Sequence, residues 1–204
     1  MILFLCAAAA TAGFFDAIAG GGGLIQLPAL MVGLQDKPVV NVLGTNKFAS
    51  IFGTANAANR YRKQVQIDKK FLASMMVPAF LGSMGGAALA SKVPTEQMRV
   101  VVLIALIAGT FLMAVLVGAL GFGFLSASAI AKFTNVATNL AAIIIFAKAG
   151  VILWGIGAAL AISNIIGSTI GSQMAIKGGS PLVRKVFLLM TAALIAKVGF
   201  DVVN

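Results

Sequence analysis

Residues 19–28 read AGGGGLIQLP, which places four consecutive glycines, Gly20 to Gly23, inside a strongly apolar chain. Glycine costs a helix about 1 kcal/mol per residue relative to alanine, so this run is expected to interrupt a helix. A phosphate-binding loop is a frequent explanation for such a run, but the spacing does not fit. A G-x-G-x-x-G motif starting at Gly20 would need glycine where Ile25 stands, and no G-x-x-x-x-G-K-[ST] occurs.

The composition indicates that the chain lies in lipid. Of its 204 residues, 60% are hydrophobic and 10% are charged, whereas a soluble domain carries about 25% charged residues. Uncharged runs cover 71–91, 100–131 and 149–176. Each is long enough to cross a bilayer, which takes roughly 20 apolar residues. The sequence therefore predicts an all-α integral membrane protein.

We expect about seven transmembrane helices and one half-helix, forming a single membrane domain over residues 1–204. The first span covers 1–18, breaks at Gly20–Gly23 and is followed by a half-helix over 23–32. The remaining spans are expected at 39–59, 71–91, 97–117, 126–146, 151–176 and 182–202.

The net charge of +10 is explained by membrane topology rather than by nucleic-acid binding. One short loop, 60–70, carries Arg60, Arg62, Lys63, Lys69 and Lys70. Basic loops between spans face the cytoplasm; a contact with lipid headgroups is the alternative. Alternation then places 118–125 and 177–185 on the side of this loop, and 148–150 and the C-terminus on the other side.

Residue types needed for several kinds of chemistry are missing. The chain has no histidine and a single cysteine, Cys6, which excludes a Ser-His-Asp triad, a Cys/His metal site and an internal disulfide. No nucleophile-plus-base arrangement stands out either. We therefore expect no enzymatic activity, no metal and no cofactor.

The chain contains a repeat with a period of 85 residues. A shift by 85 superimposes charged residues and glycines, which coincide by chance much less often than apolar residues do. The pairs are Gly33 and Gly118, Lys47 and Lys132, Phe48 and Phe133, Gly82 and Gly167, Lys92 and Lys177, and Arg99 and Arg184. Two copies, over about 1–99 and 109–204, indicate a transporter, because many transporters consist of duplicated halves. Equivalent spans lie three crossings apart, so we expect an inverted repeat.

Each copy also carries a Gly-x-x-x-Gly pair, Gly82 with Gly86 and Gly167 with Gly171. Small residues four positions apart let two helix backbones approach closely in lipid. We expect these glycines to be packing positions that touch no ligand.

Three charged residues, Asp16, Lys47 and Lys132, lie within apolar spans. An ionised group there costs about 2.5–3.5 kcal/mol even on insertion scales. The lysines could extend their long side chains to the membrane surface, and that alternative stays open. In favour of a binding site, amides and hydroxyls surround both lysines. The candidates are Thr45, Asn46, Ser50 and Thr54 in the first copy, and Thr134, Asn135, Thr138 and Asn139 in the second.

These polar residues suit an oxyanion. Ser50 and Asn135 follow their lysines by three positions, and Thr54 and Asn139 by seven, so charge and donors share one helix face. The glycine run fits the same site, because a broken helix frees backbone N–H groups and the half-helix directs its positive N-terminus at the break. A packing crossover that binds no ligand is the alternative for the glycines.

Three stretches together resemble the TauE/SafE family, the sulfite-exporter-like permeases of bacteria. They are GFFDAIAGGGGLIQLPALMVGL (13–34), NVLGTNKFAS (41–50) and SASAIAKFTNVATNLAAIIIFAKAG (126–150). The resemblance covers nearly the whole chain and implies an inner-membrane transporter of sulfite, sulfonates or related organosulfur anions. By likeness of motif, the polar run of the family falls on Asp16, Gly20–Gly23, Gly44, Thr45, Asn46 and Lys47, and on Lys132, Asn135 and Asn139.

The chain departs from that family at one place. Members usually carry a second broken segment, resembling G-x-x-D-G-x-x-G-P-G-T-G, before the second copy. Here only nine residues separate Arg99 from GTFLM at Gly109. Some tens of residues are therefore missing near Ala108–Gly109, and with them the counterparts of Asp16 and of the first glycine run.

The leading hypothesis is a secondary transporter, an exporter by its resemblance, that moves a small organosulfur oxyanion by alternating access. Lys47 and Lys132 would bind the anion, and Asp16 would be a proton site or a salt-bridge partner when the site is empty. The alternative is a non-transporting or degenerate membrane subunit, which the missing segment favours. Expected partners are the anion and membrane lipid, with a homodimer left open.

Overall fold

The structure, a computed structural model, describes residues 1–92, 111–112 and 114–203, and within them every regular element is a helix. The helices are α1 (Ile2–Ala19), α2 (Gly23–Gly33), α3 (Val39–Tyr61), α4 (Lys69–Ala90), α6 (Phe124–Lys148) and α7 (Trp154–Val203). The expected span at 97–117 lies mostly outside the described residues; of it, 111–112 and 114–117 are helical. The all-α membrane architecture is confirmed.

The glycine run breaks the first helix as predicted. Gly20 and Gly21 have φ angles of 87° and 86°, a left-handed conformation that residues other than glycine rarely adopt. A Cβ atom at Gly22 would lie 2.7 Å from the carbonyl oxygen of Ala12. The chain therefore reverses, and α2 returns along α1 until Gly33 packs against Leu5.

A second glycine divides α7. Gly179 has φ 60° and ψ −162°, so the helix consists of two arms, 154–178 and 180–203. The two predicted spans, 151–176 and 182–202, are both present. The connection between them is shorter than the expected loop 177–185, because the single residue Gly179 supplies the reversal.

Within the described residues, four helical segments are long and apolar enough to cross a membrane: α1, α4, α6 and the Trp154–Ala193 part of α7. Helix α3 is less apolar, yet its 23 residues are about 34 Å long, enough to span the hydrocarbon layer. Its polar side chains point inward: Thr45 is 0% and Thr54 3% exposed. Burial inside the bundle explains how so polar a helix can lie in lipid.

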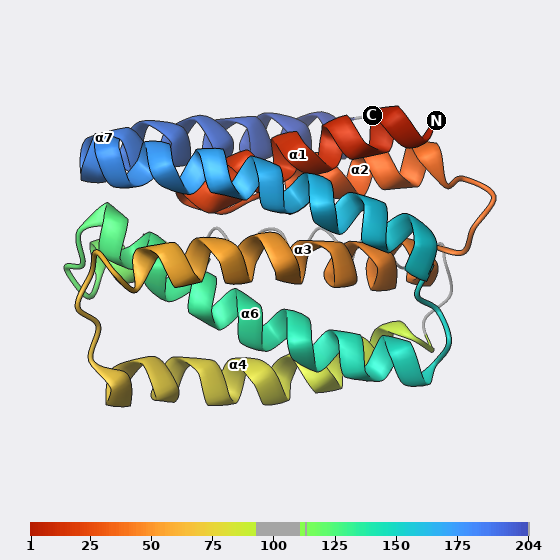
Figure 1. Cartoon of the computed structure of the whole chain (residues 1–204), viewed down its shortest axis with the longest axis horizontal. Helices are drawn as coiled ribbons and strands as arrows, with labels where there is room; N and C mark the ends of the chain where they lie inside the picture. The colour runs from red at the N-terminus through yellow and green to blue at the C-terminus, as the bar shows by residue number, and fades with distance from the viewer. Residues whose placement is uncertain (93–110, 113, 204) are drawn as a thin grey trace.

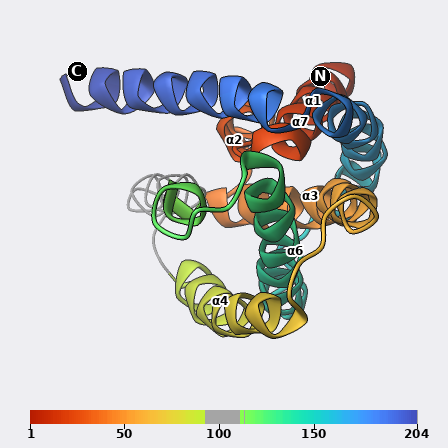
Figure 2. The same cartoon turned by 90° about the vertical axis from the view of Figure 1, so that its left-hand side faces the viewer.

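The helices are arranged in layers with α3 near the centre. Helix α4 lies on one side of it and α1, α2 and α7 on the other, and α6 passes from the start of its course beside α1 to the side of α4 (Figure 2). Helices α3 and α6 cross in opposite directions (Figure 1), since Gly44 near the start of α3 faces Phe146 near the end of α6. Helix α4 and the first arm of α7 are likewise opposed (Figure 1).

The helix boundaries reproduce the repeat. Helices α3 and α6 begin at Val39 and Phe124, and α4 and α7 begin at Lys69 and Trp154, so each pair starts 85 positions apart. Because both pairs run in opposite directions, the repeat is inverted, as parity predicts. The connections also alternate as expected. Residues 62–68, 119–123 and Gly179 lie at one end of the bundle, and 149–153 and the C-terminus at the other (Figure 1).

The Gly-x-x-x-Gly pairs differ between the copies. Gly167 and Gly171 press against α1, where a Cβ atom would collide with the carbonyl oxygens of Ala10 and Phe14. The packing prediction is confirmed for this pair. At their equivalents, Gly82 and Gly86, an added Cβ would have no atom of the described residues within 4 Å. Close packing is therefore not observed at this pair within the described residues.

This difference gives a matched test. Gly167→Ala is expected to lower the free energy of unfolding by about 1–3 kcal/mol, since the added methyl group has no room. Gly82→Ala should be neutral or stabilising by up to ~1 kcal/mol, because alanine is the better helix former. Thermal melting of the purified protein in detergent measures both variants. Equal losses would contradict the close packing of α1 on α7.

The topology has its own test. In a Cys6→Ser background, a cysteine at Gln66, which is exposed in the 62–68 connection, should resist a membrane-impermeant thiol reagent in intact cells. A cysteine at Ala149, exposed at the opposite end, should react. The reverse labelling pattern would overturn the orientation that the basic loop predicts.

Candidate functional site

A central cavity of about 340 Å³ lies where the break between α1 and α2 meets α3, α4, α6 and the second arm of α7. The volume is within the range of small-molecule sites. Most of the predicted site residues line it, although they come from distant parts of the chain. They are Asp16, Gly20, Gly21, Gly22, Gly23, Asn46, Lys47, Ser50, Asn135 and Asn139.

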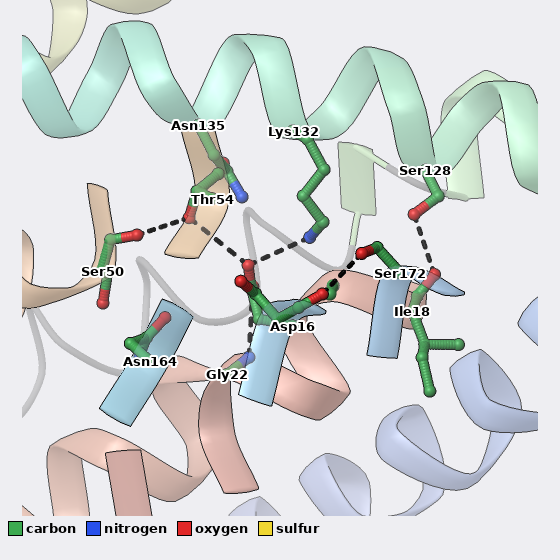
Figure 3. Close-up of polar contacts among 12 residues, drawn as sticks. Asp16, Ile18, Gly22, Ser50, Thr54, Ser128, Lys132, Asn135, Asn164 and Ser172 are labelled. Atoms are coloured by element: carbon green, nitrogen blue, oxygen red, sulfur yellow. Dashed lines mark hydrogen bonds and ion pairs between the residues drawn. The ribbon is translucent and has the colours of Figure 1, made fainter. Parts of the chain in front are cut away.

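An ion pair joins the two copies beside the cavity. The Nζ atom of Lys132 lies 3.2 Å from Oδ2 of Asp16; the lysine side chain is 0% and the aspartate side chain 20% exposed. The other carboxylate oxygen of Asp16 accepts a bond from the Gly22 N–H at 3.4 Å. The Thr54 hydroxyl lies 3.5 Å from Oδ2, but its shorter bond, at 2.8 Å, is to the Ser50 carbonyl (Figure 3). The carboxylate thereby ties the glycine break to α6.

Two side chains outside the predicted site satisfy the broken end of α1. The Tyr61 hydroxyl donates to the Ala17 carbonyl at 2.6 Å, and the Ser128 hydroxyl to the Ile18 carbonyl at 2.8 Å (Figure 3). Carbonyls at a helix end have no partner within the helix, and in lipid they must find one inside the protein. Sequence analysis missed both roles, because the sequence around an isolated Tyr or Ser in an apolar helix does not indicate which backbone carbonyl its hydroxyl will bond.

Lys47 faces the cavity from the other side. Its Nζ donates to Oδ1 of Asn139 on α6 at 3.1 Å, and in the described part of the chain no carboxylate pairs with it. Lys132 is fully buried and Lys47 lines the cavity. This placement favours a binding site over the alternative in which both side chains extend to the membrane surface.

The positive end of α2 opens onto the same space. All of Gly20 to Gly23 line the cavity, and the backbone N–H groups of Gly21 and Gly23 have no hydrogen-bond partner among the residues that the structure describes. Free N–H groups at a helix N-terminus, together with the helix dipole, attract anions.

Five of the predicted site residues lie outside the cavity lining: Gly44, Thr45, Lys132, Thr134 and Thr138. Thr45 is completely buried, and its hydroxyl oxygen accepts the N–H of Leu153 at 3.0 Å, which fixes the start of α7. Lys132 is held by Asp16, as described above. The structure thus brings Lys47 and its neighbouring amides to the cavity, but gives Thr45 and Lys132 other partners.

Sequence analysis also missed a buried amide pair. Asn164 of α7 donates to the Ala9 carbonyl at 3.2 Å and to Oε1 of Gln26 at 2.9 Å, and it fits between Gly13 and Gly53. Both amides line the cavity. They were visible as polar residues within apolar runs, but nothing in the 85-residue repeat singled them out, since Ala79 and Phe111 occupy the equivalent positions.

Three buried polar atoms in the lining have no partner in the described part of the chain: Nε2 of Gln26, Oδ1 of Asn46 and Oγ1 of Thr191. Buried polar groups are normally hydrogen-bonded, and exceptions call for a ligand, a water or a functional role. The described lining therefore combines the Lys47 cation and the Asp16 carboxylate with backbone and amide N–H groups and several serine and threonine hydroxyls.

Comparison with known proteins gives a family match. The model of the family described as "Sulfite exporter TauE/SafE" matches residues 5–115 and 107–198. "Probable membrane transporter protein ORF9" of Sinorhizobium sp is 28% identical over 238 residues, covering 95% of this chain and 90% of the relative. "Probable membrane transporter protein YfcA" of Escherichia coli K12 is 27% identical, with 93% and 86% covered. A "Probable membrane transporter protein" of Haemophilus influenzae is 26% identical, with 93% and 91% covered. No solved structure matches.

The length of these alignments bears on the missing segment. The Sinorhizobium alignment spans 238 positions, whereas this chain has 204 residues, so at least 34 positions (238 − 204) of the alignment have no counterpart here. The two matched segments meet at 107–115, beside the predicted deletion near Ala108–Gly109, a point that itself lies outside the described residues.

The buried contacts of Asn164, between Gly13 and Gly53, can be tested directly. Asn164→Ala is expected to lower the free energy of unfolding by about 1–3 kcal/mol, because the Ala9 carbonyl and the Gln26 amide lose their partner in a buried site. Ser163→Ala is the neighbouring control. In the described part of the chain the Ser163 hydroxyl bonds only to the Ala159 carbonyl of its own helix, so the loss of unfolding free energy should stay within about 0.5 kcal/mol. Similar melting temperatures for both variants would contradict a stabilising role of the Asn164 contacts.

Proposed function

The chain belongs to the sulfite exporter TauE/SafE family of membrane transporters, and on that premise we propose that it exports sulfite or a related organosulfur oxyanion. We also propose that it does so in the inner membrane of a bacterium, with loop 60–70 in the cytoplasm and with no enzymatic activity. The single observation that carries the proposal is the convergence of Lys47 with the positive end of α2 on one central cavity.

The donor set supports an oxyanion over other cargoes. An anion between Lys47 and α2 would face the full positive charge of the lysine ammonium and the partial positive charge of the helix N-terminus. The ammonium and the backbone N–H groups can both donate hydrogen bonds to it. Asn46, Ser50, Asn135 and Asn139 add amide and hydroxyl groups that satisfy the remaining oxygens. A cation would meet Lys47, and an apolar cargo would leave these polar groups without partners.

The inverted repeat supports alternating access. The site lies between copies that run in opposite directions, where rocking of one against the other exposes a fixed site to each side in turn. The Asp16–Lys132 pair, at 3.2 Å, joins the copies across that boundary. We propose that the anion binds Lys47 in every state, while contacts across the boundary change as the copies move.

One observation favours a second candidate, a non-transporting or degenerate subunit of the same family. At least 34 aligned positions of a relative have no counterpart in this chain (238 − 204). A chain that lacks a broken segment could fold and assemble without completing the transport cycle. Saturable binding of sulfur oxyanions without any flux would favour this candidate.

Proteoliposomes loaded with sulfite test the proposal. Vesicles that contain the wild-type protein should release sulfite faster than sulfite-loaded vesicles without protein. Lys47→Met should reduce the rate of release at least tenfold, because the cavity loses the cation that binds the anion. Lys148→Met, at the exposed end of α6, is the control and should keep the wild-type rate. Unchanged efflux from the Lys47→Ala/Lys132→Ala double variant would contradict the assignment of the site.

A further inference from the structure

The two repeat-related lysines differ in charge compensation. Lys132 is paired with Asp16 at 3.2 Å, and this pair connects a carboxylate of the first copy to a lysine of the second. By inverted symmetry, Lys47 would pair with the second-copy counterpart of Asp16. That counterpart falls in the segment predicted to be missing before Gly109, and the position 85 residues after Asp16 is Val101, so the repeat offers Lys47 no such partner.

The other carboxylates that the structure describes do not replace it. Asp36 and Asp68 are exposed, Asp36 in the connection before α3 and Asp68 at the N-cap of α4. Neither lines the central cavity, whereas Asp16 and Lys47 both do. Among the described side chains, the charges at the cavity are therefore Asp16, Lys132 and Lys47, with a formal sum of one positive charge.

We infer that the cavity selects a singly charged oxyanion, such as a sulfonate, over a doubly charged one, with Lys47 as the compensating cation and Lys132 as a positioning residue. This inference rests on the proposed function and narrows its substrate class. A monoanion neutralises the site, whereas a dianion brings one uncompensated charge into a largely enclosed space, where unpaired charge is unfavourable.

Lys132 is poorly placed to compensate the second charge. Its side chain is 0% exposed and it is absent from the cavity lining. A shift toward the anion would also separate it from Asp16 and leave that carboxylate unpaired beside the bound ligand. The gain from a second cation would be offset by the unpaired negative charge of Asp16. The preference between anions therefore depends on the summed charge at the cavity and not on the number of lysines.

The role of Lys132 follows from the same sum. Removing it alone leaves Asp16 to cancel Lys47, and anion binding should be lost although Lys132 touches no ligand. Removing Asp16 and Lys132 together restores the single positive charge. A purely structural pair would affect stability but not the preference between anions of different charge.

Methanesulfonate and sulfate are suitable probes, because they differ mainly by a methyl group in place of a charged oxygen. Their dissociation constants can be measured on the purified full-length protein at constant ionic strength. Methanesulfonate should bind the wild type at least about tenfold more tightly. Asp16→Asn/Lys132→Met should bind more weakly but keep this preference, whereas Asp16→Asn alone should shift it toward sulfate by about tenfold.

The outcomes separate the two proposals. Equal or tighter binding of sulfate by the wild type would overturn the charge selectivity and leave the oxyanion site in place. Loss of the preference in the double variant would overturn the positioning role of Lys132. Saturable binding of neither anion would contradict the proposed function itself. Should Asp16→Asn alone fail to fold, the wild type and the double variant still decide, since their net charge at the cavity is the same.

Discussion

A charge inside a membrane needs a partner, and the Asp16–Lys132 pair meets that need at the point where the two copies of the repeat touch. The aspartate lies in the last turn of α1, directly before the glycines, and its carboxylate also accepts from the Gly22 N–H. Since Lys132 of α6 and Gly22 both hold the carboxylate, the break in α1 has one defined geometry. That geometry directs the N-terminus of α2 into the cavity, so the anion-binding face depends on a pair that we propose does not itself bind the anion.

The two copies are related by sequence but are not equivalent in packing. In the second copy, Gly167 and Gly171 lie directly against the backbone of α1. In the first copy, the matching face of α4 has no counterpart of α1 beside it among the described residues. Only 6% of the apolar window of α4 is buried, compared with 39% in α1 and 56% in α6. We propose that the same missing segment accounts for both this open face of α4 and the lack of a carboxylate for Lys47. One change in chain length would then alter helix packing and the charge of the cavity together.

Much of this architecture could be predicted from sequence, because lipid imposes simple rules. Span length, the glycine break and the 85-residue period determine helix boundaries and their inverted directions, and the coincidence of Lys47 with Lys132 identified the polar helices. What could not be predicted was pairing. Which lysine meets Asp16, that Thr45 anchors Leu153, and that Asn164 fits between Gly13 and Gly53 all depend on how helices rotate about their axes. Repeat symmetry suggested equal roles for the two lysines. In the described part of the chain, however, only the carboxylate of Asp16 lies at the cavity, and it pairs with Lys132 alone.

The central claim is that an oxyanion binds between Lys47 and the N-terminus of α2, and its position can be measured directly. Selenite carries selenium in place of the sulfur of sulfite, so crystals of the protein grown with unlabelled methionine and soaked in selenite would report it by anomalous diffraction. The account predicts an anomalous peak in the central cavity, within hydrogen-bonding distance of the Lys47 ammonium and the backbone N–H groups at Gly21 to Gly23. Selenium bound only at the exposed basic residues of loop 60–70, with none beside Lys47, would contradict it.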